Sequence, residues 1–152
     1  MQEDLDLTYG AKITPDGDGY LVTFRDIENA FTCGDNLEEA IFNAQEVLDL
    51  MLLDRLENDD EIPLPTTIKN GEIAIAASPE VAAPALLYIV RKQSHRTLVD
   101  VARIMGVSYQ NYQRLESGKN LTMKSLKKAA YALGAKVEIR LHKLTYPMPA
   151  KN

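Results

Sequence analysis

Several residue types that mark particular protein classes are scarce in this sequence. The 152 residues include one cysteine, Cys33, two histidines and no tryptophan. A single cysteine cannot form an internal disulfide and supplies too few ligands for a cysteine-based zinc site, so we expect a reduced, cytoplasmic protein without metal or cofactor. No apolar run approaches the roughly 18 residues of a membrane span, and the first residues do not resemble a secretory signal, so no membrane role is expected.

Basic residues are also scarce, but only in the first half of the chain. Residues 1–80 contain four Lys and Arg against 19 Asp and Glu, a net charge of −15. Residues 81–152 contain 13 against three, a net charge of +10. This asymmetry indicates two modules with different partners, which we assign to residues 1–78 and 79–152. A basic module suits nucleic acid, because Lys and Arg displace counterions from phosphates, and an acidic module suits a basic protein.

The acidic half predicts a small α+β unit in the order β-β-β-α-β. Residues 7–15 and 20–25 alternate in polarity around an Asp/Gly turn at 16–19, which is typical of a β-hairpin. We expect a short strand at 30–33, a helix that runs to about Arg55, and a last strand at 72–77. Asp35 and Glu38 have the spacing of a capping box at the helix start. The expected buried stripe of this helix is Leu37, Ala40, Ile41, Ala44, Val47, Leu48 and Met51.

The basic half predicts an all-α domain built around a helix-turn-helix. Ser78-Pro79 is a helix start, although Pro84 suggests that the regular helix begins nearer Ala83. Three further helices are expected after the capping residues Thr97, Ser108 and Thr122, with a turn at Gly106. A structural bundle with basic faces is the alternative, which the +10 charge disfavours.

The second helix of this motif is expected to enter the DNA major groove. Since Tyr112 and Leu115 should face the core, the outward residues Tyr109, Gln110, Gln113 and Arg114 are the candidates for base contact. The candidates for phosphate contact are Thr97, Ser108, Asn111, Lys119 and Asn120, which lie at helix starts and in the following loop. For each of these residues, a solvated polar side chain with no partner is the alternative.

Residues 136–141 alternate strictly between polar and apolar, which predicts a C-terminal β-strand. A lone strand after a helical domain leaves its edges unpaired. We therefore expect this strand to pair with a second copy of the chain or to dock on the first half. The first arrangement gives a homodimer or a higher homo-oligomer through the C-terminal domain.

These motifs resemble those of two protein families. Tyr20 to Ile27, Thr32 to Asp35, Glu38 to Ala40 and Ile62 to Pro65 resemble the HicB family of antitoxins, although Glu28 replaces the usual proline. The second half resembles the Cro/phage-repressor helix-turn-helix in its ordered set of Thr97, Val101-Ala102, Gly106, Val107-Ser108, Leu115-Glu116, Gly118-Lys119 and Leu133-Gly134, although Leu98 replaces a frequent glutamine.

The HicB resemblance implies a truncated ribonuclease H-like fold without catalytic activity, so we expect no enzyme. It also implies that the acidic domain binds and blocks HicA, a small mRNA-cleaving toxin. The repressor resemblance implies that the basic domain binds double-stranded operator DNA of the chain's own operon. The acidic residues that we expect to contact the basic toxin are Asp26, Glu28, Glu38, Glu39 and Glu46.

Two other functions remain open at this point. A stand-alone transcription regulator with a ligand-sensing first domain predicts a concave apolar pocket within residues 1–80. A divalent-metal nuclease predicts that Asp16, Asp18 and Asp26 hold the cation and that activity is lost when any of them becomes Asn. The turn chemistry of Asp and Gly explains Asp16 and Asp18 without a metal.

Overall fold

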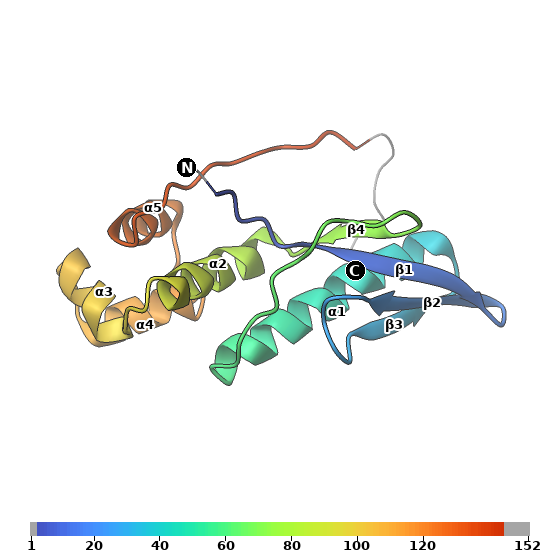
Figure 1. Cartoon of the computed structure of the whole chain (residues 1–152), viewed down its shortest axis with the longest axis horizontal. Coiled ribbons are helices and arrows are strands. Elements are labelled where there is room, and N and C mark those ends of the chain that lie inside the picture. Colours follow the sequence, from blue (N-terminus) through green and yellow to red (C-terminus); the bar gives the residue numbers. More distant parts are fainter. Residues whose placement is uncertain (1–2, 145–152) are drawn as a thin grey trace. The chain divides into compact units, whose positions relative to one another are not determined.

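The computed structural model describes residues 3–144 (Figure 1). Contacts divide the chain into two compact units. Within the described residues, the N-terminal unit is formed mainly by residues 3–54 and 63–78, and the helical unit by residues 55–62 and 79–141. None of the helices within the described residues is long and apolar enough to cross a membrane.

The N-terminal unit contains a four-stranded antiparallel sheet and one long helix (Figure 1). Its elements are β1 (Thr8–Asp16), β2 (Gly19–Phe24), β3 (Phe31–Gly34), α1 (Leu37–Glu57) and β4 (Ile73–Ala76). The strands lie in the order β3-β2-β1-β4. This arrangement confirms the predicted β-β-β-α-β unit, with β1 and β2 joined as a hairpin.

The alternation of the strands divides the sheet into a buried face and an open face. Tyr9, Ala11 and Val22 are fully buried on the face that α1 covers, where Ala40, Ala44, Leu48 and Leu52 of the helix are also fully buried. Lys12 and Thr23, which are direct partners in the β1–β2 register, are exposed on the other face. A sheet with one packed and one solvated face is typical of antiparallel topology.

The start of α1 differs from the expected capping box. Asn36, rather than Asp35, is the capping residue: its side-chain oxygen accepts from the Glu39 backbone N–H at 2.9 Å. Its carbonyl oxygen accepts the first helical bond, from the Ala40 N–H at 3.0 Å. Both Asp and Asn are good capping residues, so the sequence alone did not place the start to one residue. Leu37, expected in the buried stripe, is the first helical residue and is 46% exposed.

The helical unit contains α2 (Pro79–Gln93), α3 (Leu98–Met105), α4 (Tyr109–Glu116) and α5 (Met123–Ala132). Its core is a cluster of seven buried residues from all four helices and the residue after α5: Leu87, Val101, Ala102, Tyr112, Ala129, Ala130 and Leu133. The predicted helix-turn-helix is α3 and α4 together with the turn between them.

The expected start of the first helix near Ala83 is wrong, because α2 begins at Pro79 and contains Pro84 within it. A proline at this position removes only the hydrogen bond to the Glu80 carbonyl in the first turn. Its ring is buried, and a Cβ built on Gly118 would lie 3.4 Å from it, so the ring packs against this glycine. Packing between α2 and the loop after α4 therefore outweighs the lost bond.

The expected strand at residues 136–141 is not formed in the described part of the chain. Val137 packs against the core of the helical unit, whereas Ile139 and Leu141 are 68% and 93% exposed. A polar–apolar alternation supplies one apolar face, but a strand also requires a neighbour that completes its backbone hydrogen bonds. No neighbouring strand pairs with this segment in the described single chain.

Candidate nucleic-acid interface

Reciprocal hydrogen bonds fix the start of α3. The Thr97 hydroxyl accepts from the Asp100 backbone N–H at 3.1 Å, and the Asp100 carboxylate accepts from the Thr97 N–H at 2.8 Å. These bonds lower the pKa of Asp100. Gly106 ends the helix with φ of +71°, a conformation that favours glycine. The predicted capping at Thr97 and the turn at Gly106 are therefore confirmed.

One buried aromatic residue sets the rotation of α4. Ser108 caps this helix by accepting from the Asn111 N–H at 3.1 Å, and Tyr112 is fully buried in the core. Because residues on the opposite helical face must then point outward, the four base-contact candidates share one exposed surface. These candidates are Tyr109, Gln110, Gln113 and Arg114, all of which are exposed.

The phosphate-contact candidates surround this surface in the sequence. Thr97 and Ser108 are exposed at the two helix starts, and Asn111 is exposed in the first turn of α4. The two hydroxyl oxygens accept capping bonds, which leaves their hydrogens able to donate to a phosphate. Lys119 and Asn120 are exposed in the loop that joins α4 to α5. This placement is what phosphate contact requires, and the contacts themselves stay predictions.

A buried ion pair joins α2 to the end of α4, and the sequence reasoning did not find it. The Arg91 guanidinium donates to the Glu116 carboxylate through Nε and Nη2 at 2.8–3.0 Å, and both side chains are 7% exposed. Nη1 of Arg91 also donates to the Arg96 carbonyl at 3.0 Å. Burial lowers the pKa of Arg91, but the bonds and charge of Glu116 outweigh burial and raise it.

The only available signal for this pair was the position of Glu116. It is one of three acidic residues in the basic half, and helical spacing from Tyr112 places it on the inward face. Its contact with Arg91 fixes where α4 ends relative to α2. The pair therefore supports the surface that carries the base-contact candidates.

A second polar contact joins α2 to the acidic segment that follows α1. The Tyr88 hydroxyl donates to the Asp59 carboxylate at 2.9 Å, and the Lys92 ammonium lies 3.3 Å from the same carboxylate. Burial and the bond to Asp59 raise the pKa of Tyr88 to about 12. Residues 55–62 thus contribute to the helical unit, although they precede the last strand of the N-terminal unit in the sequence.

The expected toxin-contact residues of the N-terminal unit differ in their surroundings. Glu38 and Glu39 are exposed in the first turn of α1, Glu46 is exposed further along the helix, and Glu28 is exposed between β2 and β3. Asp26 is held within the fold: it accepts from the backbone N–H and the hydroxyl of Thr66, each at 2.8 Å, and pairs with Arg25.

The three carboxylates proposed for a nuclease do not come together. Asp16 and Asp18 lie at the hairpin turn where β2 begins, whereas Asp26 follows its end. Six strand residues separate these ends by about 17 Å at the usual rise per residue. Within residues 3–144, no group of three or more His, Cys, Asp and Glu could hold a metal ion.

Comparisons with known proteins match both units. Residues 8–83 match the family described as HicB_like antitoxin of bacterial toxin-antitoxin system, and residues 87–139 match a helix-turn-helix family. Antitoxin HicB 2 of Photorhabdus laumondii is 33% identical over 134 residues, covering 88% of this chain and 95% of that protein. Antitoxin HicB of Escherichia coli K12 is 30% identical over 135 residues, covering 88% and 98%. Antitoxin HicB 1 of Photorhabdus laumondii is 30% identical over 124 residues, covering 81% and 79%.

Proposed function

Because the chain belongs to the HicB family of antitoxins, with a helix-turn-helix DNA-binding domain, we propose that it neutralises a HicA-like mRNA-cleaving toxin and represses its own operon. The antitoxin family is not enzymatic. In this proposal the N-terminal unit covers the basic toxin and the helical unit binds double-stranded operator DNA. Both partners would be met in the cytoplasm.

The exposed polar face of α4 is the observation that supports operator binding most directly. It presents two glutamines and one arginine, whose side chains can pair bidentately with adenine and guanine. The half of the chain that carries it has a net charge of +10. An electrostatic contribution of this kind predicts that affinity falls with salt, with a log–log slope of about −0.9 per phosphate contacted.

Fluorescence anisotropy with fragments of the chain's own promoter tests this proposal. Arg114→Ala should weaken binding to the operator by about 1–3 kcal/mol, the value of one bidentate base contact. Lys12→Ala is the control, because that exposed side chain lies on β1 of the N-terminal unit, outside the helix-turn-helix and the C-terminal segment. Equal affinity for the operator and for a scrambled fragment would remove operator recognition from the proposal.

The acidic charge of the N-terminal unit is the observation that supports a basic toxin as the second partner. Glu38 and Glu39 are exposed side by side at the start of α1, where a cationic partner can reach them. Complementary charge steers association and selects partners. The first step is to isolate the small basic protein that co-purifies with the chain and to assay its cleavage of mRNA.

The cleavage assay then tests neutralisation with two matched variants. Glu38→Lys/Glu39→Lys should raise the concentration of the chain needed to stop cleavage, because two attractive charges become repulsive. Asp16→Lys/Asp18→Lys makes the same change of charge at the hairpin turn and should leave that concentration nearly unchanged. An equal loss in both variants would assign the effect to net charge rather than to the start of α1.

We also propose that the chain forms a homodimer or a higher oligomer through its C-terminal segment. Ile139 and Leu141 are 68% and 93% exposed, and Tyr131 on α5 is 84% exposed. A second copy could pair with residues 136–141 and cover these side chains. A chain ending at Gly134 should therefore sediment as a smaller species, and an unchanged mass in solution would overturn this part of the proposal.

A further inference from the structure

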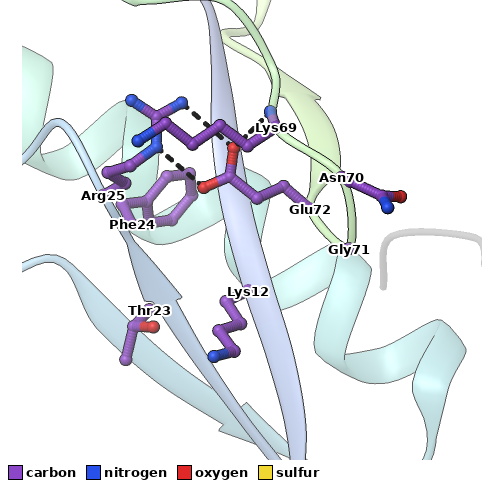
Figure 2. Close-up of a pocket in the computed structure, with 8 residues that line it drawn as sticks. All are labelled: Lys12, Thr23, Phe24, Arg25, Lys69, Asn70, Gly71 and Glu72. Carbon is purple, nitrogen blue, oxygen red and sulfur yellow. Dashed lines mark hydrogen bonds and ion pairs between the residues drawn. The ribbon is translucent and has the colours of Figure 1, made fainter.

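The few cations of the N-terminal unit gather on one side of its sheet. Residues 1–80 contain four Lys and Arg, and three of them line one open hollow of about 340 Å³ (Figure 2). Lys12 comes from β1, Arg25 follows β2, and Lys69 lies in the loop before β4. The same half of the chain contains nineteen acidic residues. If each cation simply paired with a nearby acidic residue, the four cations would be expected at separate places on the surface. We call this feature the cationic hollow.

Arg25 builds one wall of the cationic hollow and has no donor to spare. Its Nε and Nη2 donate to the two Glu72 oxygens at 2.9 and 3.0 Å, and Nη1 donates to Asp26 at 2.9 Å. The remaining N–H groups reach the Thr66 hydroxyl and the Thr67 carbonyl. All five guanidinium N–H groups are thus engaged, and the two carboxylates, Asp26 and Glu72, more than balance its single charge. Arg25 therefore shapes the wall of the cationic hollow and has no N–H group left for a ligand.

Glu72 is engaged as completely as Arg25. One carboxylate oxygen also accepts from the Lys69 backbone N–H at 2.7 Å, while the Glu72 N–H donates to the Lys69 carbonyl at 3.0 Å. The bonds from Arg25 and Lys69 lower the pKa of Glu72 to about 2, so it stays ionised at neutral pH. These bonds close the loop that carries Lys69, whose own charge also lowers the pKa of Glu72.

Lys12 and Lys69 carry the two ammonium groups of the cationic hollow. Among the ion pairs of residues 3–144, neither ammonium group takes part. Lys12 lies directly opposite Thr23 in the sheet register, so the ammonium and the hydroxyl rise from the same open face. Figure 2 shows these two at one end of the hollow and the Arg25–Glu72–Lys69 cluster at the other.

The backbone leaves room for this arrangement at Gly10. A Cβ at this position would lie 2.5 Å from Glu72 Oε1 and 3.3 Å from Arg25 Nη2. Any side chain there would displace the ion pair that forms the wall. Glycine at this point of β1 therefore allows the Arg25–Glu72 pair to cross the open face of the sheet.

We propose that the cationic hollow binds a single oxyanion group, a phosphate or a carboxylate, beside Lys12, with the exposed Lys69 side chain reaching it from the other end of the hollow. Thr23 lies beside it as a hydroxyl donor. Phosphate and carboxylate are both compact groups with two or three acceptor oxygens. Ammonium and hydroxyl groups can donate hydrogen bonds to these oxygens. A polyanion such as nucleic acid is disfavoured, because the surrounding half of the chain carries −15. Its lining residues are not among those proposed to contact the operator or the toxin.

The test is an amide NMR titration of the full chain with sodium phosphate, with sodium acetate, and with sodium chloride at matched ionic strength. We expect saturable shifts at the amides of Asn70 and Gly71 with phosphate, acetate or both, and no saturation with chloride. The oxyanion whose shifts saturate identifies the chemical group that the cationic hollow binds. Measuring the amide shifts of residues 69–72 distinguishes binding at this site from binding at the helical unit, whose DNA-binding surface also attracts phosphate.

Three variants decide whether the lysines are responsible. Lys12→Gln and Lys69→Gln should each raise the apparent Kd for the oxyanion at residues 69–72 at least tenfold. Both side chains are exposed, so the fold should persist. Lys127→Gln, which removes an exposed lysine from α5, should leave that Kd unchanged. Linear shifts equal to those with chloride, or the same Kd in all variants, would overturn the proposal.

Discussion

The buried ion pair between Arg91 and Glu116 makes a quantitative prediction about stability. Glu116→Gln keeps the shape of the side chain but leaves the Arg91 guanidinium buried without a counter-charge. Breaking a buried pair by removing one partner costs about 3–5 kcal/mol. We expect about 3 kcal/mol here, the lower end of that range, because a Gln oxygen in the Oε1 position still accepts two of the three bonds. That loss lowers the ratio of folded to unfolded protein roughly 150-fold.

Urea unfolding followed by far-UV circular dichroism measures this loss. Glu138→Gln is the matched control: it removes an ion pair whose side chains are 83% and 61% exposed, at 3.7 Å. That change should cost less than about 0.5 kcal/mol. The double variant Arg91→Met/Glu116→Leu should recover most of the stability lost in Glu116→Gln, because an apolar pair needs no desolvated charge. A loss of similar size in Glu116→Gln and Glu138→Gln would refute the reasoning.

Other positions give further expected outcomes. Tyr88→Phe should cost about 1.5 kcal/mol, because it removes a bond to a carboxylate, whereas Tyr112→Phe should be nearly neutral, because its buried hydroxyl has no partner in the described residues. The pKa of Tyr88 is raised to about 12, so its contribution to stability should hold below pH 10 and be lost between pH 10 and 12. The unfolding midpoint of the wild type should therefore fall relative to Tyr88→Phe over that interval. Gly10→Ala should lower the thermal midpoint, since its Cβ would lie 2.5 Å from a carboxylate oxygen. Gln113→Ala should relax base preference in an operator-selection assay, whereas Lys119→Gln should weaken binding to every sequence and reduce the salt slope by about 0.9.

Local chemistry explains which parts of the fold could be predicted from the sequence. The caps at Thr97 and Ser108 and the turn at Gly106 depend on neighbouring residues, and the structure confirms all three. The exposed face of α4 followed from helical spacing once Tyr112 was placed inward. The exact start of α1 and the continuation of α2 through Pro84 did not follow, because equally good caps and tertiary packing decided them.

The candidate sites also divide into those that the sequence predicts and those that depend on tertiary packing. The surface of α4 lies on one element, so helical periodicity alone was enough to predict its residues. The Arg91–Glu116 pair joins positions 25 residues apart, and the cationic hollow joins β1, β2 and the loop before β4. No local pattern encodes contacts of this kind, because they depend on how the elements pack.

By itself, the sequence determined the two opposite charges of the chain, the order of its helices and strands up to α5, the resemblance to HicB antitoxins, and the polar face of α4. These features depend on composition and on contacts within a few residues. Only the tertiary structure decided that Arg91 neutralises Glu116 in the core, that Asp26 serves the fold, and that Lys12 and Lys69 line one hollow. It also showed that residues 136–141 form no strand within the described single chain, because a strand requires a partner that alternation cannot supply.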